Sequence, residues 1–288
     1  MKRAAFLLAL LLAGAAGAHA QTLHSPSRKL TLRFQLGPNG EPTYTLRFGS
    51  KTVLQSSRLG LALQQQPSLA QGFTVARIDS SQRDDTWQPV WGEVESIRNH
   101  YRELAVTLQQ PTSAGRRRVL RFRLYDDGLG FRYEVPQQPG LTYFVVQDEL
   151  TEFNLPANHR AFWIPGDPDS NEYAYVTSRV NEVDTRPIEP IQQRAAPTTV
   201  QTPLMLKSDD GLYVNIHEAA LRNYPAMLLH VDTRTFGLRS QLVPDATGTG
   251  AKAYLQAPEH TPWRTIVVSD KAPDVLASKL ILNLNEPS

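Results

Sequence analysis

The stretch RRRVLRFRLYDDGLGFRYEV, residues 116–135, contains two short alternating segments joined by a turn. In the first segment Leu120, Phe122 and Leu124 alternate with arginines, a period of two that places apolar and charged side chains on opposite faces of a strand. The Asp-Asp-Gly that follows is a turn signal, so we expect two successive strands here. The arginines then form the solvent-facing side of a sheet, and we do not expect them to bind nucleic acid.

The same alternation recurs along most of the chain. Residues 28–36 read RKLTLRFQL, and the Pro38-Asn39-Gly40 that follows contains the strongest short hairpin signal. Short segments, frequent turns and 21 prolines predict an all-β sandwich rather than alternating strands and helices. The other expected strands cover residues 43–54, 104–109, 141–147, 161–164, 212–217, 226–231, 236–242 and 263–269.

Helices and long loops are few. A short helix is expected at residues 275–279, where Asp274 can cap it after Pro273. Residues 183–202 carry three prolines and no apolar period, which predicts a long loop of the kind that often carries function. No repeat or Gly/Ser linker divides the chain, so we expect one large domain or two intimate ones.

The first 20 residues predict a secretory signal peptide. Two cations precede a short apolar run, and Ala18-His19-Ala20 supplies the small residues of a cleavage site. The run is too short for a membrane-spanning helix, which needs about 20 apolar residues, and no later stretch is longer. With no cysteine for lipid attachment, we expect a periplasmic or secreted domain over residues 21–288 and no membrane span.

Composition excludes several kinds of site. The chain has no cysteine, which excludes disulfides, thiolate metal sites and cysteine nucleophiles. Without the two cations of the signal peptide, basic and acidic residues are equal at 28 each, so no general attraction to nucleic acid or anionic membrane is expected. A chain of this length can bury a large core without disulfides.

An acidic stretch begins with Asp167, Asp169 and Asn171, the spacing that opens an EF-hand loop. The match then fails, because the sixth and twelfth places hold Glu172 and Ser178 where that loop needs Gly and Glu. From spacing alone a solvated turn is favoured. The alternative is a turn that gives one or two oxygens to a hard cation.

Two further segments carry residue types that suit sugars. The first runs from Trp87 through Trp91 to Glu93, and the second contains Asn99 and His100. Aromatic planes pack on the C–H faces of a pyranose, and amide or imidazole groups can hydrogen-bond its hydroxyls. From the residues alone, buried tryptophans and a structural histidine remain the favoured interpretation.

No complete catalytic motif is present, neither a nucleophile elbow, nor H-E-x-x-H, nor a phosphate-binding loop. His217 and Glu218 are adjacent, but neighbours on a strand point to opposite faces. We therefore do not expect this pair to act together on one sugar oxygen, as a mutarotase-like enzyme would require.

Taken in order, a series of motifs resembles the N-terminal domain of glycoside hydrolase family 97, the family of the SusB-type α-glucosidase of starch-utilising bacteria. The resemblance covers nearly the whole of residues 21–288. The motifs are SRLGL (57–61), WQPVWGE (87–93), IRNHY (97–101), DGLGFRY (127–133), FWIPGD (162–167), NEY (171–173), HEAAL (217–221), TPWRTI (261–266) and LNLNEP (282–287).

This resemblance implies a large β-super-sandwich related to the galactose-mutarotase-like fold, with one or two short helices. In the family a catalytic (β/α)₈ barrel follows, and members invert at α-glucosides or retain at α-galactosides. The resemblance also implies a Ca²⁺ ion held mostly by barrel glutamates, with one more glutamate from the N-terminal domain. Glu172 matches that glutamate and is the predicted calcium ligand, which reverses the preference for a plain solvated turn.

The chain ends about where the family passes into its barrel, so we expect a truncated protein with no catalytic residue of its own. Ca²⁺ takes six to eight oxygens, so calcium is expected only with a complementary barrel. By position in the matched motifs, Trp91, Glu93, Asn99 and His100 are predicted to line the sugar pocket. The expected partners are an oligosaccharide or α-glycoside and a family 97 barrel in trans. A stand-alone carbohydrate-binding module remains the alternative.

Overall fold

The computed structural model describes residues 20–111, 115–193, 195–246 and 248–285. All of the predicted signal peptide except its last residue lies outside these ranges. The described chain forms 21 strands, two short α-helices and one 3₁₀ turn at Val180–Glu182. The predicted all-β class with one or two short helices is therefore confirmed.

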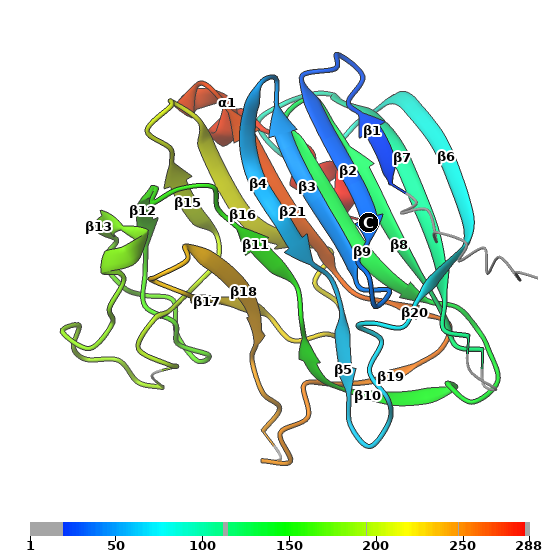
Figure 1. The fold of residues 1–288 in the computed structure, drawn as a ribbon. Coiled ribbons are helices and arrows are strands. Elements are labelled where there is room, and N and C mark those ends of the chain that lie inside the picture. Colours follow the sequence, from blue (N-terminus) through cyan, green and yellow to red (C-terminus); the bar gives the residue numbers. More distant parts are fainter. Residues whose placement is uncertain (1–19, 112–114, 194, 247, 286–288) are drawn as a thin grey trace, which may run out of the picture.

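One large antiparallel sheet of ten strands forms the first layer of the sandwich. It curves across the whole molecule (Figure 1). Its strands in spatial order are β13 (Val176–Arg179), β12 (Arg160–Trp163), β15 (Leu204–Lys207), β16 (Tyr213–Ala219), β21 (Trp263–Ser269), β9 (Gly128–Val135), β8 (Arg117–Leu124), β7 (Ile97–Gln109) and β6 (Thr74–Trp87), with β20 (Glu259–His260) paired to β9.

Three smaller sheets lie against this large sheet, and Figure 1 shows β1 to β4 in front of β21, β9, β8 and β7. The four-stranded sheet is β1 (Gln21–His24), β2 (Leu30–Leu36), β3 (Pro42–Phe48) and β4 (Lys51–Arg58). A second is β11 (Glu152–Asn154), β18 (Gly237–Leu242), β17 (Met227–Val231) and β14 (Thr199–Val200). The third is β19 (Ala253–Gln256), β10 (Tyr143–Glu149) and β5 (Leu61–Leu63).

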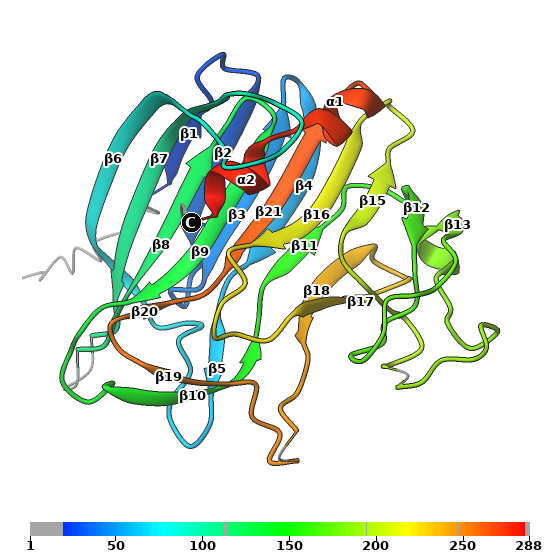
Figure 2. The same cartoon turned by 180° about the vertical axis from the view of Figure 1, so that it is seen from behind.

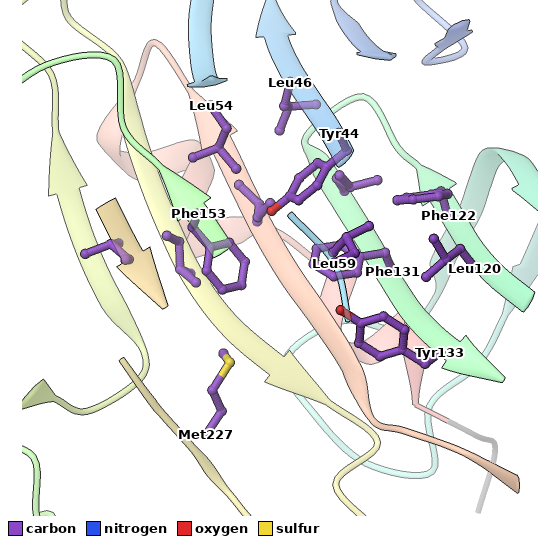
Figure 3. Packing of buried hydrophobic residues seen from close by; sticks show 14 of the residues in the cluster. Tyr44, Leu46, Leu54, Leu59, Leu120, Phe122, Phe131, Tyr133, Phe153 and Met227 are labelled. Atoms are coloured by element: carbon purple, nitrogen blue, oxygen red, sulfur yellow. The ribbon is translucent and has the colours of Figure 1, made fainter. Parts of the chain in front are cut away.

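The core lies between the layers and is built by the alternation seen in the sequence. On β8 the apolar positions Leu120 and Phe122 are fully buried, as predicted, and Arg121 between them is half-buried on the opposite face. Arg118 on the same strand is completely buried, so the expectation that the arginines face solvent is wrong there. The Phe122 ring lies 6.0 Å from that of Phe34 on β2, and the Tyr44 ring on β3 lies 5.2 Å from that of Phe131 on β9. Figure 3 shows Tyr44, Phe122 and Phe131, together with several leucines, in the space between the sheets.

The predicted hairpin at Asn39-Gly40 is confirmed as the connection between β2 and β3. Gly40 has φ of 73°, and a Cβ there would lie 2.4 Å from the backbone nitrogen of Phe73, so only glycine fits. The prediction of a single strand over 43–54 is wrong. The chain reverses at Gly49-Ser50, and β3 and β4 form a second hairpin.

Two short helices, α1 (Ala272–Ala277) and α2 (Leu280–Leu284), cover part of the outer face of the large sheet (Figure 2). α1 begins earlier than predicted, because Pro273 stands in its first turn, where its missing N–H costs nothing. α2 packs close to β9, and a Cβ on Gly130 would lie 2.5 Å from a methyl of Leu284. In the described ranges no helix is long and apolar enough to span a bilayer.

Candidate functional site

The loop that carries Glu172 joins β12 to β13 and is organised around Asp167. One carboxylate oxygen of Asp167 accepts hydrogen bonds from the amides of Asp169 at 2.8 Å and Ser170 at 3.3 Å. The other accepts from the Tyr173 hydroxyl and, at 3.1 Å, from the amide of Gln193. Asp167 is buried, so this carboxylate fixes the loop from within rather than facing solvent.

These hydrogen bonds also set the ionisation of Asp167. Burial would raise the pKa of its carboxyl, but the bonds from Tyr173 and from three backbone amides outweigh burial and lower the pKa. The carboxylate is therefore charged at neutral pH and holds four donors in place.

The predicted long loop over 183–202 packs directly on the acidic loop. The amide of Gly166 donates to the carbonyl of Thr199 at 2.8 Å, and the amide of Ala195 donates to Gly166 at 3.0 Å. A Cβ on Gly166 would lie 2.8 Å from that Thr199 carbonyl oxygen, so the close approach requires glycine. The side-chain amide of Gln201 adds a bond to the Ser170 carbonyl. The two loops therefore form one supported surface.

Glu172 lies exposed on this surface. Its backbone amide donates to the Ser170 hydroxyl at 3.3 Å. Within the described residues its carboxylate has no hydrogen-bond or ion-pair partner, and no three His, Asp or Glu side chains are grouped to hold a metal ion. A lone exposed carboxylate fits one position in a calcium shell of six to eight oxygens and cannot form that shell alone.

Trp91 and Glu93 lie in the loop between β6 and β7, and both are exposed. Trp91 is 88% exposed and its neighbour Val90 84%, so the residue-level expectation of a buried tryptophan is wrong at Trp91. The start of the loop is fixed to α2, where the Trp87 indole N–H donates to the Asn283 side chain at 2.8 Å. The exposed indole is available to a partner.

Asn99 and His100 lie next to each other on β7 but face opposite sides of the large sheet. Asn99 is buried on the helix side, where its side-chain oxygen accepts a bond from the Tyr125 hydroxyl at 3.2 Å. His100 is half-buried on the other side, with Nε2 3.8 Å from a carboxylate oxygen of Asp84. One ligand cannot contact both side chains from one face.

The five predicted residues do not gather in one place. Glu172 follows β12 near one edge of the large sheet, and Asn99 and His100 lie on β7 near the other edge. Six inter-strand steps separate these strands, each about 4.8 Å, or roughly 29 Å in all. Within this chain the predicted calcium ligand and the predicted sugar contacts therefore belong to two separate surfaces.

His217 and Glu218 confirm the expected opposite orientation on β16. The His217 ring nitrogen Nδ1 lies 3.1 Å from the Thr202 hydroxyl. The Glu218 carboxylate points into the core, where it accepts from Arg264 and from the amide of Met227 at 3.1 Å. The two side chains share no partner and do not form an acid–base pair.

Glu218 belongs to a buried ionic cluster that the sequence patterns did not predict. The Arg264 guanidinium donates to the two oxygens of Glu149 at 2.8 and 2.7 Å, as well as to Glu218. Tyr224 also donates to Glu149, at 3.1 Å. Arg264 and Glu149 are completely buried, so no substrate reaches them. The cluster, defined as Arg264, Glu149 and Glu218, therefore joins β10, β16 and β21 across the core.

Comparison with known proteins identifies a matching family and similar solved structures. The family model described as "Glycosyl-hydrolase 97 N-terminal" matches residues 23–287. A solved glycoside hydrolase family 97 enzyme in complex with acarbose, from Pseudoalteromonas sp. strain K8, is similar with a TM-score of 0.83 and 33% sequence identity. The similarity covers 93% of this chain and 38% of that chain.

Two curated relatives are similar in sequence. A retaining alpha-galactosidase of Bacteroides thetaiotaomicron is 23% identical over 284 residues, which cover 93% of this chain and 41% of the relative. A probable retaining alpha-galactosidase of Streptomyces bingchenggensis is 28% identical over 278 residues, covering 92% of this chain and 39% of the relative. The chain thus spans about two-fifths of the length of the proteins it matches.

Proposed function

The chain belongs to the glycosyl-hydrolase 97 N-terminal family, and we propose that it completes the active-site pocket of a family 97 α-glycosidase. In this role Glu172 supplies one ligand to a calcium ion, and the other ligands and the catalytic residues come from a catalytic barrel. The chain alone hydrolyses nothing. The substrate class is an oligosaccharide or α-glycoside, as the acarbose and panose complexes of the similar Pseudoalteromonas enzyme suggest.

One observation carries this proposal, namely the exposed Glu172 carboxylate on a loop that is otherwise rigidly bonded. Asp167 and Gly166 hold that loop from below, so Glu172 is presented outward on a fixed support. A ligand that is already held in place loses little conformational entropy when it binds a metal ion.

The predicted signal peptide supports a periplasmic or secreted location for this activity. A protein recovered from the periplasm or the medium would then begin at Gln21, which N-terminal sequencing measures directly. A chain that keeps its first 20 residues would contradict this location.

A stand-alone carbohydrate-binding module is the second candidate, and the exposure of Trp91 favours it. In that function the lone chain binds sugars through the indole face. Quenching of Trp fluorescence by maltose-like or galactose-like sugars that is lost in Trp91→Ala would favour this candidate over pocket completion.

Hydrolysis of nitrophenyl α-glucoside and nitrophenyl α-galactoside tests the proposed function. The assay compares the purified chain, a family 97 barrel lacking its own N-terminal domain, and their mixture, each with calcium and with a chelator. We expect calcium-dependent hydrolysis in the mixture only. Activity of the chain alone would contradict the absence of catalytic residues.

Two matched variants separate the role of Glu172 from a general effect of charge. Glu172→Gln in the mixture should lower calcium-dependent hydrolysis. Glu95→Gln removes the same charge from an exposed loop near the other edge of the large sheet and should leave hydrolysis unchanged. Equal activity of the two mixtures would exclude Glu172 as a calcium ligand.

A further inference from the structure

The three-stranded sheet of β5, β10 and β19 lies in the lower part of Figure 1. Two tyrosines of this sheet are exposed to solvent. On β10, Phe144 and Val146 are buried, and the alternation turns Tyr143 outward, where it is 69% exposed. On β19 the same alternation leaves Tyr254 60% exposed. Large aromatic side chains that lie exposed together on strands are unusual on a protein surface and indicate a contact site.

The register places both rings on one face. Tyr143 is paired with Gln256, and Val145 is paired with Tyr254. The two tyrosines are therefore diagonal cross-strand neighbours, whose side chains lie within about 7–8 Å of each other. Such a pair makes a broad aromatic platform on a backbone that is fixed by ladder hydrogen bonds.

Glutamines surround this platform. The turn of Gln64, Gln65 and Gln66 follows β5, and the amide of Gln64 donates to the Val145 carbonyl at 2.9 Å, which ties the turn to β10. With Gln256 these side chains border a hollow of about 550 Å³, and none of the residues that line it is charged. Each amide offers two donors and an acceptor to a ligand.

We propose that this surface, defined by Tyr143, Tyr254, Gln256 and the Gln64–Gln66 turn, is a binding site for a neutral oligosaccharide. The C–H faces of pyranose rings pack on the tyrosine rings, and the glutamine amides exchange hydrogen bonds with the hydroxyls. A neutral lining matches a neutral ligand, since no charge of the protein needs a counter-ion there.

The site has room for more than one sugar ring. Its volume lies within the range of about 300–1,000 Å³ typical of small-molecule sites. A second hollow of about 700 Å³ shares Tyr254, Leu255 and Gln256 with the first, but Asp245, Lys252 and Glu259 also line it, so the neutral part of the surface ends near Tyr254. This sheet contains neither Glu172 nor Trp91, and the inference does not depend on the proposed calcium role.

Affinity electrophoresis of the purified chain tests the site, with soluble starch as the neutral ligand and polygalacturonate as a charged one. Starch should retard the wild-type chain, and polygalacturonate should not. Tyr143→Ala and Tyr254→Ala should each weaken starch binding roughly three- to tenfold, the loss expected for one aromatic contact. Tyr143→Phe, which keeps the ring, should retain most of the binding.

Tyr175→Ala is the matched control, since Tyr175 is 63% exposed on the loop before β13 and is not among the residues that line the hollow. It should bind starch like the wild type. Thermal unfolding of each variant checks that the sheet is intact. Absence of starch retardation, retardation unchanged in both alanine variants, or loss that follows Trp91→Ala instead would each overturn the proposal.

Discussion

Replacement of Arg264 by leucine tests how much the buried ionic cluster contributes to the stability of the core. Arg264 lies completely buried in β21 and donates to both oxygens of Glu149 and to Glu218. Leucine keeps apolar volume but removes the only guanidinium in the buried ionic cluster. Two carboxylates are then left in the core without their counter-charge.

The expected loss is large because the remaining charges cannot reach water. Removing one partner of a buried ion pair costs about 3–5 kcal/mol of unfolding free energy. For a domain of this size, 1 kcal/mol shifts Tm by about 2–4 °C, so Arg264→Leu should lower Tm by roughly 6–20 °C.

The loss should also depend on pH with a defined sign. Burial raises the pKa of Glu218, and Arg264 opposes that rise. Without Arg264 the folded-state pKa of Glu218 rises further above its unfolded value, so the folded protein holds a proton that the unfolded chain releases. Stability then falls as pH rises through the folded pKa, and the deficit should be smaller at pH 5 than at pH 7.

Thermal unfolding followed by circular dichroism at pH 5 and pH 7 measures both effects. Arg77→Leu is the control, because Arg77 forms an exposed ion pair with Asp79 on β6 and such pairs contribute little. A Tm drop no larger than that of Arg77→Leu, or a drop that is equal at the two pH values, would refute this account of the cluster.

Three other variants test further parts of the structure. Gly130→Val should displace α2, because the new side chain meets Leu284. Chemical denaturation should then show an unfolding free energy lower by about 1–3 kcal/mol, and a variant as stable as the wild type would contradict this packing. Asp167→Asn weakens the anchor of the Glu172 loop and should speed cleavage of that loop in limited proteolysis, whereas an unchanged cleavage rate would remove Asp167 as its anchor. Arg118 is buried over the rings of Phe73 and Tyr133 and has no carboxylate partner among the described residues. Arg118→Met should therefore keep Tm or raise it, and a large drop would show that the charge stabilises the fold.

Local alternation predicted most of the sandwich, because a half-buried strand must place its apolar side chains on one face. β8 and β2 follow that rule and were expected from their sequences. β6 was not, since it is a 14-residue edge strand exposed over nearly its whole length, with the sequence TVARIDSSQRDDTW. An edge strand exposed on both faces carries no apolar period, so this strand becomes visible only through its antiparallel pairing with β7.

The site was predictable only in part for a similar reason. Glu172 was identified from resemblance, and the sequence around it could not reveal that Asp167 turns inward to hold the loop. Nor could spacing place Asn99 and His100 relative to Glu172, because strand order in the large sheet is set by tertiary packing. Arg264 was missed because a charged residue inside an apolar strand resembles an ordinary surface position until its partners are known.

Calcium affinity of the complex between this chain and a family 97 barrel tests the central proposal most directly. Isothermal titration would compare complexes formed with the wild-type chain, with Glu172→Gln and with Glu95→Gln. Because each carboxylate contributes to the charge of the shell, Glu172→Gln should weaken calcium binding about tenfold or more, while Glu95→Gln should not change it. Equal calcium affinity in all three complexes would contradict the assignment of Glu172 as a calcium ligand.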